Sequence, residues 1–402
     1  MYYIGIDVAR LSCECAIIDN DGETVCKPFG IYTNKDEYSK LLDKLKKLNI
    51  PKSDSLCGLE ATGNLWENLY EYLTSRGYKV MVLNPYQTNK YHEVMLKKAK
   101  TDAIDAYVIA GLLRSGHASQ SHIAEDTIQS LRDLVRLRAS YQANLKAYKR
   151  KAYSLLSLLF PEYLNCIKDP FAIVSTEVLI NYPTAFDFKE LKPKHILKIA
   201  RHHQGNNFDE ALASKIISLA KDSVYSGKAR IARGTVLRSL LVQIKSLKEQ
   251  IDMLSREIDD ILKPKNPSLK GPGDNLSSIP GIGPNTIASI LAEVGDIMRF
   301  SNQREFIGYI GLYPEIKESG ESGKKPILTK RGSPLLKHAL YMASVASIKH
   351  NPVMRGVYNK KRSQGKSPKQ ALIVVARKLA CVIYSMLKSG HQYCESRVLV
   401  AA

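Results

Sequence analysis

The stretch Tyr2-Tyr3-Ile4-Gly5-Ile6-Asp7-Val8 decides the fold of the amino-terminal third, because it has the pattern of a buried strand that ends in an acid. A second apolar run, Leu56-Cys57-Gly58-Leu59-Glu60, ends in the same way. Asp102 and Asp105 stand three residues apart in a predicted helix, so both occupy one of its faces. Acids at the ends of two strands and on one helical turn can converge on a single point.

The elements around these acids predict an α/β domain over residues 1–118. Hydrophobic spacing and turn residues indicate, in chain order, strands at 2–8, 13–19 and 23–31, a helix at 35–48, a strand ending at Glu60, a helix at 64–76, a strand at 78–83 and a helix that begins near Thr101. This order is typical of a ribonuclease-H-like domain. In that architecture, acids of the first and fourth strands and of the last helix meet at one edge of the sheet.

Four carboxylates gathered at one point repel one another, so the arrangement predicts divalent cations that neutralise them. Oxygen ligands alone favour Mg²⁺ or Mn²⁺ over zinc. We therefore expect Asp7, Glu60, Asp102 and Asp105 to form a two-metal site for phosphoryl transfer. Each acid taken alone is more typical of a turn, a cap or a solvated helix face, so the prediction depends on the four in combination.

The charge of the chain predicts a polyanionic partner. Its 402 residues are enough for two or three domains, and 59 Lys and Arg against 39 Asp and Glu give a net charge of +20. From Ser322 to Cys394 no acid occurs, while 15 Lys or Arg lie between Lys324 and Lys388. Ordinary surfaces mix both signs, so this stretch is predicted to contact phosphates.

Nothing in the sequence predicts secretion or membrane insertion. The seven cysteines form no C-x-x-C pair, and Cys57 and Cys381 lie in apolar runs, as buried thiols in a reducing cytoplasm do. No signal peptide precedes Ile4, and no apolar run approaches about 18 residues. We expect a cytoplasmic protein without membrane contact.

A helical middle region is predicted over 119–266. Heptad spacing is clearest at 235–262, where two seam positions are taken by Leu237, Ile244, Ile251 and Ile258 and by Leu240, Leu247, Leu254 and Ile261. This composition favours a two-stranded coiled coil with a second copy, and a pair with the helix predicted at 126–160 of the same chain is the alternative. Pro264 and the Pro-Gly cluster at 267–274 are expected to end the helix and to form a linker.

A mainly helical domain is predicted for 267–402, with Ile279-Pro280-Gly281-Ile282-Gly283 near its start. A Pro-Gly-Ile-Gly turn between helices is the helix-hairpin-helix signature, in which Gly281 and Gly283 let backbone N–H groups approach a phosphate. A tight turn without a ligand is the alternative. Beyond a Ser-Gly loop at 319–323, we expect a group of basic residues to contact nucleic acid: Lys324, Lys325, Lys330 and Arg331.

Motifs at both ends of the chain resemble those of a known family. They occur here in the family's order: Tyr3-Ile4-Gly5-Ile6-Asp7, Glu60-Ala61-Thr62-Gly63, Asn84-Pro85, Lys100-Thr101-Asp102-x-x-Asp105-Ala106, Ile279-Pro280-Gly281-Ile282-Gly283, Tyr309-x-Gly311-Leu312-x-Pro314, Ser319-Gly320 and Thr329-Lys330-Arg331-Gly332. The family is the bacterial insertion-sequence transposases of the RuvC-like DEDD type, which are related to the Piv invertases. Several members are guided by a bridge RNA. The resemblance covers about 1–160 and 235–395.

The resemblance implies a recombinase that cuts and rejoins DNA. The four acids would be its metal-binding tetrad, and a serine of the Ser-Gly loop would become transiently joined to DNA. Ser319 matches the motif better than Ser322, because it precedes glycine at the expected spacing from Lys330-Arg331-Gly332, and Ser322 remains the second candidate. The implied partners are the DNA of the element ends and the target, a bridge RNA, and further copies of the chain in a homodimer or homotetramer.

Two other functions are compatible with fewer of these features. A plain RuvC-like nuclease would cut branched DNA with a metal-activated water and would leave no protein–DNA adduct. A non-catalytic nucleic-acid-binding regulator would bind DNA equally well after Asp7→Ala or Asp102→Ala.

Overall fold

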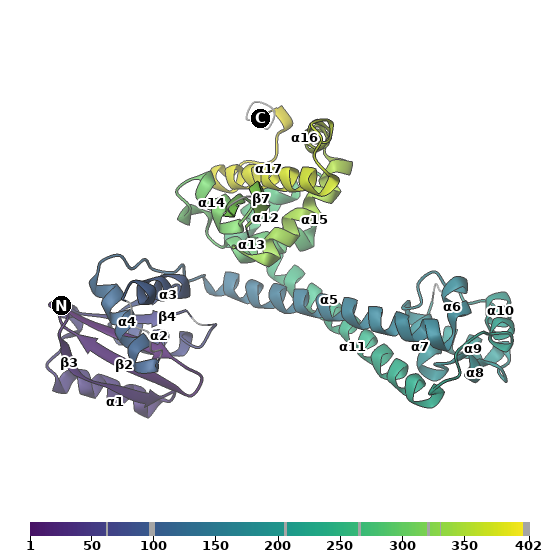
Figure 1. Ribbon diagram of the computed structural model, residues 1–402, viewed down its shortest axis with the longest axis horizontal. Coiled ribbons are helices and arrows are strands. Elements are labelled where there is room, and N and C mark those ends of the chain that lie inside the picture. The colour runs from purple at the N-terminus through teal and green to yellow at the C-terminus, as the bar shows by residue number, and fades with distance from the viewer. Residues whose placement is uncertain are drawn as a thin grey trace. The chain divides into compact units, whose positions relative to one another are not determined.

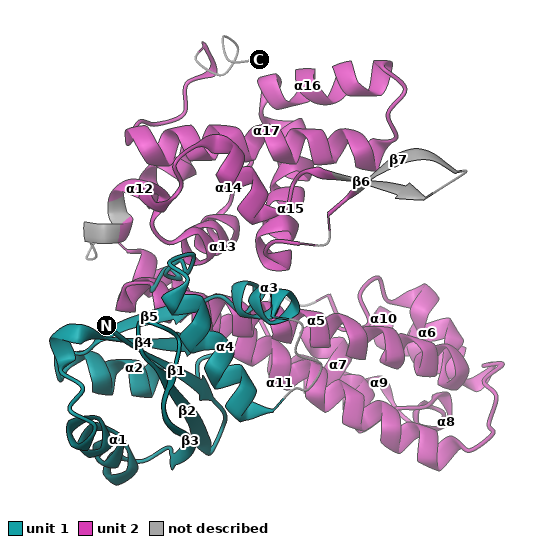
Figure 2. Ribbon diagram, turned by 60° about the vertical axis from the view of Figure 1, so that its left-hand side comes forward, with its two compact units in different colours: residues 1–123 teal, residues 124–402 magenta. Residues whose placement is uncertain are grey.

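The computed structural model describes the chain except residues 62, 96–100, 205–206, 264–266, 320–321, 330 and 397–402. The side chains at 267–268, 270 and 315–327 lie outside the description as well. The chain divides into two compact units, 1–123 and 124–402, which Figure 2 colours teal and magenta. Each unit is described by itself.

The described part of unit 1 alternates strands and helices much as the sequence predicts. Its elements are β1 (Tyr2–Val8), β2 (Ser12–Ile18), β3 (Thr24–Tyr32), α1 (Lys35–Lys47), the 3₁₀ turn η1 (Lys52–Asp54), β4 (Ser55–Glu60), α2 (Glu67–Thr74), β5 (Lys79–Leu83), α3 (Pro85–Val94) and α4 (Asp102–Arg114). The strands form one sheet in the order β3-β2-β1-β4-β5. β1 pairs antiparallel with β2 and parallel with β4, and β4 pairs parallel with β5.

The two faces of this sheet are covered differently. Ile4 and Ile6 of β1 belong to a core with Leu41 of α1 and Leu69 of α2. On the other face α4 lies directly against the strands, because Gly5 has no side chain: a Cβ there would stand 2.0 Å from the Ala106 carbonyl oxygen. Small residues therefore allow a helix backbone to touch the middle of the sheet.

Unit 2 is mainly helical in its described part, with one two-stranded sheet. Its elements are α5 (Asp126–Leu159), α6 (Pro161–Cys166), α7 (Ile173–Asn181), α8 (Ala185–Phe188), α9 (Pro193–Ala200), α10 (Glu210–Lys221), α11 (Arg230–Leu262), α12 (Pro267–Ser277), α13 (Pro284–Val294), the 3₁₀ turn η2 (Ile297–Arg299), α14 (Gln303–Ile310), β6 (Pro314–Ser319), β7 (Ser322–Leu328), α15 (Pro334–His350), α16 (Pro352–Ser363) and α17 (Pro368–Ser389). The hairpin β6–β7 was not predicted from the sequence.

The two long helices α5 and α11 run side by side within the chain (Figure 1). Of the predicted seam, Leu237, Ile244, Leu247, Leu254 and Ile258 are buried on α11. The intramolecular pair, which the sequence left as the alternative to a coiled coil between copies, is the one that this structure contains. Helices α6 to α10 pack at one end of the pair around a second core, in which Phe160 and Phe188 are fully buried.

The predicted linker at 267–274 is wrong, because this stretch lies within α12 and Pro272 stands inside the helix. Leu269 and Leu276, seven residues apart, are buried in the carboxy-terminal core. Burial of this apolar stripe outweighs the helix-breaking tendency of proline and glycine.

The same core accounts for a long apolar helix, α17. By length and composition α17 could cross a membrane. Its residues Val375, Leu379, Ile383 and Met386 are instead buried in the core shared with α13, α14 and α15. Packing within unit 2 therefore accounts for the apolar character of α17.

Candidate functional site

Asp7 and Glu60 end neighbouring strands at the same level of the sheet. Ile6 of β1 pairs with Leu59 of β4, so the next residues along each strand are the two acids. Side chains alternate along a strand, and therefore Asp7 shares the face of Gly5 and Glu60 the face of Gly58. Both glycines face α4, as the close approach of Ile109 and Leu113 to Gly58 also shows. The sheet thus presents both acids on the face that α4 covers.

The amino-terminal turn of α4 lies at the same end of the sheet as these two acids. Arg114, the last residue of α4, donates to the Asp21 carbonyl in the β2–β3 turn, which is the end where β1 begins. The first turn, with Asp102 and Asp105, therefore points toward the end of β1. As predicted, Thr101 caps this turn, accepting from the Ile104 N–H at 3.4 Å, and the positive end of the helix favours the two acids.

Two further residues, which the sequence analysis missed, belong to this acidic edge. Thr88 of α3 is buried and donates its hydroxyl to Glu60 at 2.5 Å, which orients that carboxylate. Glu14 of β2 pairs across the sheet with Asp7. Partial burial raises the pKa of Glu14, and the negative charge of Asp102 raises it further. Alternation along β2 and the antiparallel register were the signals that could have revealed Glu14.

The chemistry of this edge suits a hard divalent cation, because its donors are carboxylate oxygens. In the described residues, no three His, Cys, Asp or Glu side chains yet stand close enough to share one ion. The structure therefore gathers the four predicted acids at one edge by their backbone positions, and no closed ligand set is formed.

The glycines of the predicted helix-hairpin-helix turn have different environments. The turn joins α12 to α13; the sequence predicted the helix after it, whereas α12 takes the place of the predicted linker. Gly281 has a φ of +91°, and a Cβ there would stand 2.8 Å from the Ser347 backbone of α15, so its missing side chain serves packing. Gly283 is the N-cap of α13 and has open space around its Cα. Of the two, only Gly283 is open to a ligand.

The two candidate serines face each other across the hairpin β6–β7. Ser319 ends β6, Ser322 begins β7, and the two are paired in the register. Their side chains fall outside the description, as do those of Lys324, Lys325 and Lys330. Ser319 and Ser322 therefore stand at the adjoining ends of the two strands.

The base of this hairpin is held by two glycines that sequence motifs place far apart. Gly311 follows α14 with a φ of +81°, and a Cβ on it would meet the Arg331 carbonyl oxygen at 2.1 Å. Gly332 approaches the Ile310 carbonyl in the same way. Lys337 of α15 donates to the Arg331 carbonyl at 2.6 Å. The segments around Gly311 and Gly332 therefore pack closely against each other and form one junction at the base of the hairpin.

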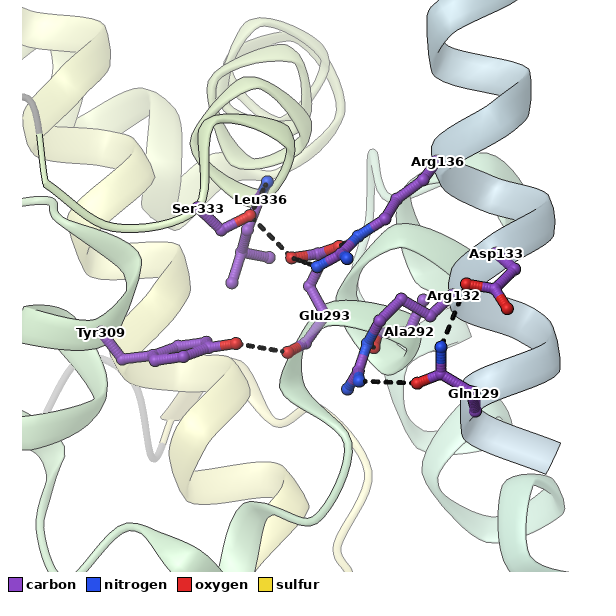
Figure 3. A network of polar contacts seen from close by, with 9 residues as sticks. All are labelled: Gln129, Arg132, Asp133, Arg136, Ala292, Glu293, Tyr309, Ser333 and Leu336. Atoms are coloured by element: carbon purple, nitrogen blue, oxygen red, sulfur yellow. Dashed lines mark hydrogen bonds and ion pairs between the residues drawn. The ribbon is translucent and has the colours of Figure 1, made fainter. Parts of the chain in front are cut away.

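Glu293, which the sequence analysis missed, ties that junction to α5 (Figure 3). Its carboxylate accepts from Arg136 Nε of α5 at 2.7 Å and from the Ser333 hydroxyl at 2.8 Å. The Tyr309 hydroxyl donates to the Glu293 carbonyl at 2.9 Å. Ser333 also caps α15. One buried acid thus joins α5, α13, α14 and the start of α15.

The electrostatics of Glu293 identify it as a structural acid. Its side chain is 3% exposed, and burial by itself would raise its pKa. Hydrogen bonds from Arg136 and Ser333, together with the charges of Arg136 and Arg132, outweigh burial and lower the pKa of Glu293. The carboxylate is therefore ionised and neutralised by arginine at neutral pH.

The acid-free stretch presents exposed cations, as predicted. Several lie on α16, on α17 and on the connection between them: Lys360, Arg362, Lys366, Lys369 and Arg377. Arg331, beside the hairpin, is also exposed. A surface of one sign favours a polyanion.

Comparisons with known proteins match both ends of the chain. A family model of DEDD proteins from IS110, described as a transposase, matches residues 4–161. A second, described as the transposase IS116/IS110/IS902 family, matches residues 273–359. The first match contains the four acids, and the second contains the helix-hairpin-helix turn, the hairpin and Glu293.

Similar proteins come from several bacteria. A 43.6 kDa protein of insertion element IS110 from Streptomyces coelicolor is 26% identical over 80% of this chain and 78% of its own length. The pilin gene-inverting protein of Moraxella bovis is 22% identical over 97% of both chains. The transposase for insertion sequence element IS1111A of Coxiella burnetii is 23% identical over 97% of this chain and 90% of its own.

Proposed function

We propose that this chain, which belongs to the IS116/IS110/IS902 family of transposases, cuts and rejoins DNA through the acidic edge of unit 1 and a serine of the β6–β7 hairpin. The observation that carries the proposal is the placement of Asp7, Glu60 and the first turn of α4 at one end of one sheet. The strand order β3-β2-β1-β4-β5, with its first three strands antiparallel, supports a ribonuclease-H-like architecture of the RuvC type.

The chemistry assigned to the chain is a transesterification. Ser319 Oγ attacks the phosphorus of a DNA phosphodiester, an Oγ–P bond forms, and the bond from phosphorus to one sugar oxygen breaks. The serine hydroxyl loses its proton, and the departing sugar oxygen gains one. Mg²⁺ or Mn²⁺ held by Asp7, Glu60, Asp102 and Asp105 would activate the hydroxyl and stabilise the leaving oxygen. Because the phosphoserine keeps the energy of the broken bond, rejoining requires no ATP.

A bridge RNA is the proposed guide of this reaction. The resemblance supports it, and the acid-free surface of α16 and α17 supplies cations for the backbone phosphates of RNA and DNA alike. Base pairing would then select the sequence, while the protein holds the strands.

The decisive experiment traps the covalent intermediate. Purified protein is incubated with labelled element-end DNA, a bridge RNA and Mg²⁺, denatured, and examined for a protein–DNA adduct. We expect an adduct with the unchanged protein and with Ser322→Ala, and none with Ser319→Ala. Loss with Ser322→Ala alone reassigns the nucleophile to Ser322. DNA cleavage without any adduct indicates a nuclease that uses water.

A second measurement tests the metal without relying on activity. Mg²⁺ that binds only the folded chain raises its melting temperature. We expect a rise for the unchanged protein and for Ser319→Ala, and a much smaller one for Asp102→Asn. An equal rise in all three would contradict a metal site at this edge.

A further inference from the structure

A cavity of about 370 Å³ lies in unit 2 between α5, α13 and α15. Its lining contains two cations and no carboxylate among the described residues. The residues that matter for its chemistry are Arg138, Lys146, Asn285, Thr286 and His338. The described lining is mainly apolar, and these few polar and cationic groups are what would hold a small anionic group.

Arg138 is the unusual member of the lining. Its side chain is only 4% exposed, and in the described part of the chain it forms no ion pair with a carboxylate. Its Nη1 donates to Asn285 Oδ1, whereas its Nε is buried with no acceptor among the described residues. Burial lowers the pKa of Arg138, and the charge of Asp259 opposes this. The charge of Asp259 acts on Arg138 without a direct ion pair between the two described residues, so the buried guanidinium is only partly neutralised and favours an anion in the cavity.

The amino terminus of α13 supplies a second attraction for an anion at the same place. Asn285 and Thr286 belong to the first turn of this 11-residue helix. The N-cap is Gly283, so no side-chain hydrogen bond caps the helix. A helix start carries a partial positive charge, and because Pro284 has no N–H and the Thr286 N–H donates to the Gly283 carbonyl, the Asn285 N–H is the donor that this described turn offers to a phosphate. Helix terminus and buried arginine therefore meet at one cavity.

We propose that this cavity binds a phosphate group of a nucleic-acid backbone, with Arg138 as its main charged donor and Lys146 and the first turn of α13 as its supports. His338 is the one ring in its described lining, and no Phe, Tyr or Trp occurs there, so the cavity is a poor platform for stacking bases. Such a contact positions a strand without reading its sequence. The inference deepens the proposed function, since it takes nucleic acid as the substrate of unit 2.

The test measures binding of three probes: a duplex DNA, an RNA hairpin and inorganic phosphate. For the two polymers, Arg138→Met is expected to weaken binding about tenfold and to reduce the salt dependence by about one counter-ion. Lys146→Gln is expected to weaken binding about threefold. Because Lys146 is exposed, this substitution should leave the fold unchanged. Arg150→Gln, on an exposed part of the same helix outside the cavity, is the matched control and should stay within about twofold.

Inorganic phosphate, compared with chloride at equal ionic strength, should raise the melting temperature of the unchanged protein and not that of Arg138→Met. Without ligand, Arg138→Met should melt at the same temperature or higher, because it removes a buried charge. Weakened binding of DNA, of RNA or of both supports the site and identifies which backbone occupies it. Equal effects of Arg138→Met and Arg150→Gln, or a response to inorganic phosphate alone, would overturn it.

These measurements involve binding only. Failure of DNA cutting in Asp102→Asn, or absence of a serine adduct, concerns the proposed function and leaves the outcome for Arg138 unchanged.

Discussion

The acidic edge of unit 1 and the Glu293 junction of unit 2 use carboxylates in opposite ways. At the acidic edge, several acids are brought to one end of a sheet, and burial together with the charge of Asp102 raises the pKa of Glu14. At the junction, a single buried acid is surrounded by arginine and serine donors, which lower the pKa of Glu293. Negative charges lie near one another at the acidic edge, and a cation would reduce their repulsion. The charge of Glu293 is already balanced by arginine.

The contrast separates a chemical site from a structural one. Glu293 is the more deeply buried acid, yet all of its interactions are internal and hold four helices together. The acids of unit 1 are brought to one end of the sheet by their backbone positions, where we propose that they hold a divalent cation.

Asp102→Asn should reduce strand exchange by roughly 10³-fold, as happens when one essential member of a catalytic group is lost. The substitution keeps the size of the side chain, so the melting temperature without metal should not fall. Strand exchange is followed on labelled DNA with Mg²⁺. Activity within about tenfold of the unchanged protein would remove Asp102 from the site.

Gly5→Ala should lower the free energy of unfolding by about 3 kcal/mol and also impair strand exchange, because the new methyl group would collide with the backbone of α4. Gly58→Ala is the matched control. Its methyl group would meet only the side chains of Ile109 and Leu113, which can shift, so a loss of about 1 kcal/mol is expected. Urea unfolding measures both. Equal losses of unfolding free energy in the two variants would mean that the packing of α4 on the sheet does not depend on its close approach to Gly5.

Glu293→Gln should lower the free energy of unfolding by about 2 kcal/mol, because it leaves Arg136 without its counter-ion. The value lies below that for fully buried pairs, since Arg136 is 57% exposed. Glu257→Gln, at an exposed acid on α11, should change stability by less than about 0.5 kcal/mol. If both substitutions had the same small effect, the junction would not be held by Glu293.

The smallest expected effect is the pH dependence of the difference in unfolding free energy between the unchanged protein and Glu293→Gln. The pKa of Glu293 is lower in the folded state than the value of about 4.3 expected for an unfolded chain. Its stabilising contribution is therefore complete above about pH 5 and is lost as the pH falls through the folded pKa. The gap in unfolding free energy between the unchanged protein and Glu293→Gln should narrow by about 1 kcal/mol below about pH 4. A gap independent of pH would contradict the ionised state of Glu293.

Much of unit 1 could be predicted from the sequence, because its signals are local. Strand β1 has the predicted limits, Thr101 is the predicted cap, and the spacing of Asp102 and Asp105 places both in the first turn of α4. Alternation along strands and helical periodicity involve only a few neighbouring residues, so they can be recognised without knowing the rest of the structure. The element order then placed the acids at one edge.

Other features were decided only by tertiary contacts. Arg136 and Ser333 are 157 and 40 residues from Glu293, and no local pattern links them. Burial of Leu269 and Leu276 made a helix of a stretch whose prolines and glycines indicated a linker.

The sequence by itself thus determined which segments become strands and helices and which acids end them, since those choices depend on neighbouring residues. The partner of α11, the environment of Arg138 and the role of Glu293 required the folded chain, because burial and charge pairing join residues that the sequence keeps far apart.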